Sequence, residues 1–128
     1  MSGLHFGCGK WGGEDNTANP IFEIFDEIEE VIGIADESWF IDFRDAVDTE
    51  SERLVLDAKA LAAIEGPMTE YKAMLLKDSG ATDEDLANYK IPDSVSDEMA
   101  DRLLCVGDFF LGLARAKQTS EPLEVYFA

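Results

Sequence analysis

The sequence predicts a mainly α-helical protein, a compact bundle of about five helices with short N- and C-terminal β-strands placed to pair with each other. An α+β arrangement is the alternative. Three observations support this prediction. The length of 128 residues fits a single domain. Four capping patterns each introduce an apolar stretch at helical spacing. The two ends of the chain instead alternate apolar and polar residues, as strands do.

The first strand is predicted near the N-terminus and its partner near the C-terminus. A loop over residues 11–17 follows the first strand, because glycines and polar residues gather there. The alternating apolar residues are Leu4, Phe6 and Cys8 at the front and Leu123, Val125 and Phe127 at the end.

The clearest helix is predicted over residues 20–32. Asn19 is placed to cap it, and Pro20 suits the first helical position because its ring fixes φ and needs no N–H partner. Gly33 is placed to end the helix. Apolar residues recur at helical spacing and form one stripe: Ile21, Ile24, Phe25, Ile28, Val31 and Ile32.

The opposite side of this helix is acidic and supplies the first candidate binding residues. Glu23 and Glu27 are like charges four residues apart, as are Asp26 and Glu30, and each pair costs a helix a few tenths of a kcal/mol. The helix itself contains no basic residue to relieve them. Such a conflict favours a working surface over one selected for stability alone. The candidate partner-binding residues here are Glu23, Asp26, Glu27 and Glu30.

Residues 36–47 fit two structures. Trp39, Phe40 and Phe43 follow helical spacing, whereas Trp39, Ile41 and Phe43 alternate as in a strand. We favour the helix. In either case three more acidic residues lie near the first helix in sequence and join the candidate partner-binding residues: Asp42, Asp45 and Asp48.

The middle of the chain predicts two further helices separated by a glycine–proline pair. Thr49-x-x-Glu52 is a capping-box pattern and predicts a helix that ends at Gly66. Pro67 then begins a second helical segment, which ends at Gly80.

Two more capping patterns precede the last helices. Thr82-x-x-Asp85 predicts a short helical turn, and Ser94-x-x-Asp97 predicts the longest helix, which runs to about Lys117. Its core stripe is predicted to contain Met99, Leu103, Val106, Phe110 and Leu113.

Motifs for cofactors and metals fail on their spacing, so no cofactor and no metal ligand are predicted. The glycine-rich segment 7–13 resembles a phosphate loop, but Leu4 stands where the first glycine belongs and Trp11 where a Ser or Thr belongs. A zinc site needs three or four protein ligands, and the chain has one His and two Cys. The start of a calcium loop at residues 48–52 fails because Arg53 replaces the required glycine.

Two candidate reactive side chains near the N-terminus are given structural roles. His5 and Cys8 would point to opposite faces of a strand, which disfavours a catalytic pair. His5 is expected to be partly buried with a backbone partner, and Cys105 to lie in the core. Reduced thiols are expected for Cys8 and Cys105.

The net charge of −18 is the strongest functional signal. Residues 14–52 carry fourteen acidic residues and one basic residue, so the charge is concentrated there. Such a field repels nucleic acids and anionic membrane surfaces and attracts basic partners. No apolar run reaches the ~20 residues of a membrane span, and the first residues do not fit a signal peptide. A cytoplasmic protein is therefore expected.

These observations favour an acidic module that docks on a basic protein partner which acts on nucleic acid, and neutralises it. Bacterial immunity proteins against nuclease toxins and phage-encoded mimics of DNA work in this way. Carboxylates are too abundant to single out an acid–base couple, so no catalytic residue and no enzyme activity are predicted. Three alternatives stay open: a small-molecule-binding domain or minor enzyme with a pocket near the glycine-rich N-terminal loop, an oligomerising structural subunit, and acids that only keep the protein soluble.

Overall fold

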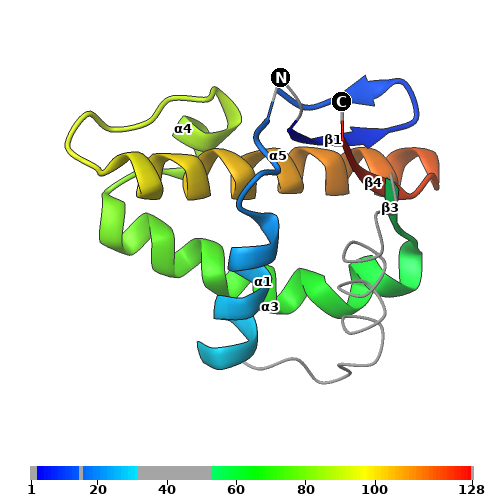
Figure 1. Ribbon diagram of the computed structural model, residues 1–128, viewed down its shortest axis with the longest axis horizontal. Helices are drawn as coiled ribbons and strands as arrows, with labels where there is room; N and C mark the ends of the chain where they lie inside the picture. The colour runs from blue at the N-terminus through cyan, green and yellow to red at the C-terminus, as the bar shows by residue number, and fades with distance from the viewer. Residues whose placement is uncertain (1–2, 15, 32–52, 128) are drawn as a thin grey trace.

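The computed structural model describes residues 3–14, 16–31 and 53–127. These residues form four helices, where about five were predicted for the whole chain, and a small antiparallel sheet. The prediction of a mainly helical fold with short strands is confirmed (Figure 1). The predicted segment 36–47 and the helix end at Gly33 lie outside the described residues, as do Asp42, Asp45 and Asp48. The helices are α1 (Ile21–Val31), α3 (Ala58–Ser79), α4 (Asp83–Ala87) and α5 (Asp97–Thr119).

The sheet joins the two ends of the described chain. The strands β1 (Leu4–Cys8) and β4 (Leu123–Phe127) pair antiparallel with Leu4 opposite Phe127, which confirms that the predicted terminal strands pair. The predicted loop over residues 11–17 is partly wrong, because Trp11 pairs with Cys8 as part of a two-residue strand. The strands are β1 (Leu4–Cys8), β2 (Trp11–Gly12), β3 (Arg53–Leu56) and β4 (Leu123–Phe127), in the order β2-β1-β4-β3.

The first helix is confirmed, but its start differs from the prediction. It begins at Ile21, so Pro20 precedes the first helical residue and does not occupy that position. The Oδ1 atom of Asn19, which was predicted to cap the helix, accepts the N–H of Leu4 at 2.7 Å and so ties the start of α1 to the sheet. The first four residues of the predicted apolar stripe are buried, with no exposed surface on Ile21, Ile24, Phe25 and Ile28.

The prediction of a helix that begins at the Thr49 capping box is wrong at the start of the helix. Residues 53–56 form β3, and the helix begins only at Ala58, after this strand has ended. The N-cap is Asp57, whose Oδ1 accepts the N–H of Ala60 at 2.9 Å. The alternation in Arg53-Leu-Val-Leu56 fits a strand paired with β4, and this tertiary pairing decides against the helix.

The predicted break at residues 66 and 67 is also wrong, since α3 continues through it to Ser79. A proline clashes with the Cβ of the preceding residue when that residue is helical. Gly66 has no Cβ, so this part of the clash is absent and Pro67 is accommodated inside the helix. The predicted end at Gly80 is confirmed: it has the left-handed φ of 78°, and its N–H donates to the Leu76 carbonyl at 2.9 Å.

The last two helices begin at side-chain caps. The predicted capping box at Thr82 and Asp85 is confirmed, with both side chains accepting the other residue's N–H. The longest helix begins two residues later than predicted, because Ser96 and not Ser94 is the cap. Its Oγ accepts the N–H of Met99 at 3.1 Å.

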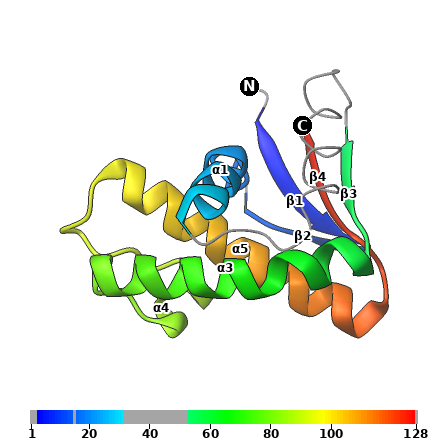
Figure 2. The same ribbon diagram turned by 90° about the horizontal axis from the view of Figure 1, so that it is seen from below.

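The central helix α5 contacts the sheet on one side and the other three described helices elsewhere. Leu103 is fully buried, as predicted. Phe110 is only half-buried, whereas its neighbour Phe109 has no exposed surface, so the predicted stripe is wrong at this position. Because α5 is covered on several sides, it buries more than one stripe of residues. A prediction based on a single apolar stripe therefore does not identify all of its core residues correctly. Figure 2 shows α1 and α4 on opposite sides of the α3–α5 layer.

Candidate functional site

A cluster of charged side chains lies where α1 crosses α5. Arg102 of α5 places its Nη2 atom 2.5 Å from Glu27 Oε1 and 3.6 Å from Glu23 Oε2. Its Nη1 atom bonds to Glu98, one turn earlier on the same helix. The Arg102 side chain is only 12% exposed. We call these four residues the Arg102 cluster.

The carboxylate of Glu27 is held at both oxygens. Arg102 contacts Oε1, and the Tyr71 hydroxyl of α3 donates to Oε2 at 2.5 Å. Burial, together with this hydrogen bond to Glu27, raises the pKa of Tyr71 well above its ordinary value. The Tyr71 hydroxyl therefore stays protonated and keeps its donor role at neutral pH.

The Arg102 cluster corrects one premise of the sequence analysis. Glu23 and Glu27 are like charges on α1, but Arg102, far away in sequence, lies beside both. The conflict between them is therefore relieved by tertiary structure and does not by itself indicate a functional surface. Three carboxylates still meet one guanidinium, so the cluster keeps an excess of negative charge.

The other predicted α1 acids lie beside the cluster and differ in exposure. Glu30 is exposed, while Asp26 is half-buried and takes part in interactions of its own. Asp101 of α5 is also exposed and lies three residues after Glu98, so the two are neighbours on the helix surface. We call the combined surface the acidic face: Glu23, Asp26, Glu27 and Glu30 of α1 with Glu98 and Asp101 of α5.

A second acidic group, which the sequence analysis missed, is buried in the core. Asp108 of α5 has no exposed surface. Its Oδ2 atom accepts the Glu14 N–H at 2.9 Å and the Thr17 hydroxyl, and its Oδ1 atom accepts the Tyr89 hydroxyl at 2.5 Å. A Cβ on Gly13 would lie 2.5 Å from Oδ2, so only glycine lets the backbone approach so closely.

The partners of Asp108 come from two separate segments. Glu14 and Thr17 belong to the loop between β2 and α1, and Tyr89 follows α4. Tyr89 has a positive φ of 55°, a conformation that L-residues with large side chains rarely adopt. The signal in the sequence was a lone acid in the apolar run Val106-Gly-Asp-Phe-Phe110. Asp108 thus fixes loop positions and has the character of a structural residue.

The side chains near the N-terminus have the structural roles that were expected. His5 Nδ1 accepts the Asn16 N–H at 3.2 Å, and its ring stacks on Tyr126 at 5.7 Å between centroids. Both Cys8 and Cys105 are free, buried thiols. Burial raises the pKa of Cys105, and the charge of Asp108 adds to this effect. Within the described ranges, no group of three or more His, Cys, Asp or Glu is placed to hold a metal ion.

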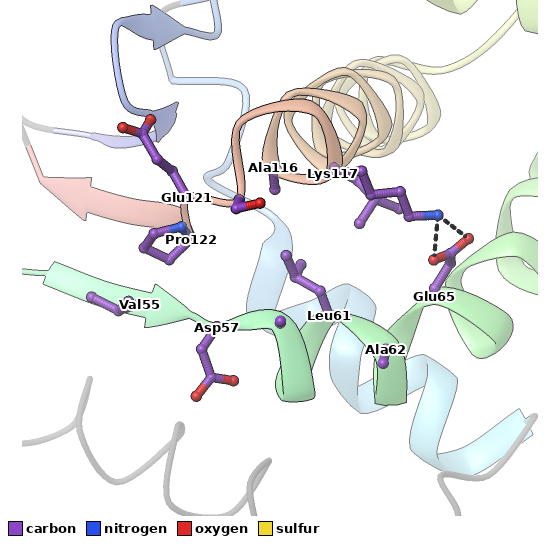
Figure 3. Close-up of a pocket in the computed structure, with 12 residues that line it drawn as sticks. Val55, Asp57, Leu61, Ala62, Glu65, Ala116, Lys117, Glu121 and Pro122 are labelled. Atoms are coloured by element: carbon purple, nitrogen blue, oxygen red, sulfur yellow. Dashed lines mark hydrogen bonds and ion pairs between the residues drawn. The ribbon is translucent and has the colours of Figure 1, made fainter.

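A cavity of about 430 Å³ lies between the start of α3 and the end of α5 (Figure 3). If the protein binds a small molecule, the sequence predicted the pocket near Trp11 and the glycine-rich segment. Neither Trp11 nor that segment lines this cavity. Its walls are mostly apolar and come from β3, α3, α5 and the turn before β4. The apolar lining residues are Val55, Ala58, Leu61, Ala62, Leu113, Ala116 and Pro122.

No family model, no curated protein and no solved structure matches the chain. None of the helices in the described ranges combines the length and the apolar character that crossing a bilayer requires.

Proposed function

We propose that this protein is an acidic docking module for a basic protein partner of the kind that acts on nucleic acid, such as a nuclease-type toxin. The observation that carries the proposal is the Arg102 cluster. There Glu23, Glu27 and Glu98 from two helices converge on one largely covered guanidinium. Negative charge is thereby gathered at one place on the surface.

The cluster supports docking because it fixes carboxylates in advance. Glu27 is bonded at both oxygens, so it loses little conformational freedom when a partner arrives. Exposed acids at Glu30 and Asp101 would supply the rim, where charge chiefly raises the association rate. The net charge of −18 adds a long-range field of the same sign.

The test is a pair of charge-reversal variants with equal changes in net charge. Glu30→Lys with Asp101→Lys alters the acidic face but leaves the bonds of Glu27 intact. Glu84→Lys with Asp78→Lys serves as the matched control, because both positions are exposed and belong to α4 and to the end of α3. Figure 2 places α4 on the side of the helices away from α1.

A basic partner would be captured from native-host extract with the wild-type protein, purified, and measured by surface plasmon resonance at about 50 and 500 mM salt. We expect the acidic-face variant to bind at least tenfold more weakly, mainly through a slower association rate, while the control stays within about twofold. Equal binding by both variants, or an affinity that ignores salt, would overturn the proposal. A homo-oligomer that buries the acidic face would contradict it as well.

A further inference from the structure

We draw no further inference here: the strongest candidate, the apolar cavity of about 430 Å³ between α3 and α5, carries none, because nothing in the part of the chain that the structure describes shows what occupies it.

Discussion

The Tyr71 hydroxyl and the Arg102 guanidinium bind opposite oxygens of the same carboxylate, that of Glu27. This arrangement joins three helices through one side chain, because Tyr71 belongs to α3, Glu27 to α1 and Arg102 to α5. The contact between α1 and the α3–α5 layer therefore includes the hydrogen bonds of Glu27 to Tyr71 and Arg102, beside its apolar core.

Replacing Glu27 by Lys should destabilise the fold. The change removes the acceptor for Tyr71 and places a second cation beside Arg102, and hydrogen bonds to charged groups contribute about 1.5–3 kcal/mol each. We expect the free energy of unfolding in urea to fall by about 1–3 kcal/mol. Glu30→Lys, on the exposed part of the same helix, should change it by less than about 0.5 kcal/mol. Equal effects of the two variants would show that the hydrogen bonds of Glu27 to Tyr71 and Arg102 do not contribute to stability.

Removing the buried carboxylate of Asp108 should lower the free energy of unfolding by more than any substitution at the surface. Asp108→Ala leaves three donors without their acceptor, and each unsatisfied buried donor costs about 1–3 kcal/mol. We expect the free energy of unfolding, measured in urea, to fall by about 3 kcal/mol or more. Asp108→Asn, which keeps one acceptor oxygen, should lose less, and Asp101→Ala should be close to neutral. A near-neutral Asp108→Ala would contradict the structural role of this residue.

The two neighbouring phenylalanines of α5 should differ in their contribution to stability. Phe109 is fully buried, and truncating a large aromatic side chain in a packed core costs about 3–5 kcal/mol. Phe110 is half-buried, with Lys72 Nζ 4.3 Å from its ring centroid. Phe110→Ala should therefore cost at least about 1 kcal/mol less than Phe109→Ala. The reverse order in thermal or urea unfolding would mean that the helix is rotated.

Alkaline pH should destabilise the protein through Tyr71 and Tyr89. Burial and the bonds to Glu27 and Asp108 raise the pKa of Tyr71 and of Tyr89 above the ordinary value of 10.0. The folded protein then keeps protons that the unfolded chain loses. This contribution to stability is complete below about pH 10 and declines above it, by up to ~1.4 kcal/mol per pH unit for each tyrosine.

The measurement is the free energy of unfolding between pH 8 and 11, with tyrosinate absorbance followed in parallel. Tyr71→Phe and Tyr89→Phe should each flatten the decline above pH 10, and the double variant should flatten it most. A decline of the same steepness in all variants would assign the effect to other groups.

Local signals in the sequence were sufficient for several elements. The stripe of α1, the capping box of α4 and the alternation of β1 and β4 each depend on neighbouring residues, and each was predicted. The prediction of a helix break at Pro67 was wrong because the steric cost of a proline depends on the residue before it, which here is glycine. The strand β3 was not predicted because it is stabilised by pairing with β4, about 70 residues later in the chain.

The candidate site was predicted only in part, for a related reason. The acids of α1 were identified from their spacing, but their partner Arg102 is distant in sequence and no local pattern links them. Asp108 was missed although a lone acid within an apolar helical run is a visible signal of a buried, satisfied carboxylate. The cavity between α3 and α5 depends on the packing of four separate elements, so the sequence alone could not locate it.

The pairing of β1 with β4 has a consequence for the order of folding. β1 is the first described element to leave the ribosome and β4 is the last, yet they are the two central strands of the sheet. The helices can form as they emerge, whereas β1 waits for a partner more than 100 residues downstream. Until β4 is synthesised, Phe6 and Cys8 lack part of their covering. β2 can pair with one edge of β1 early, but the other edge of this apolar strand stays unpaired throughout most of the synthesis of the chain, and that edge is where a chaperone would be expected to bind.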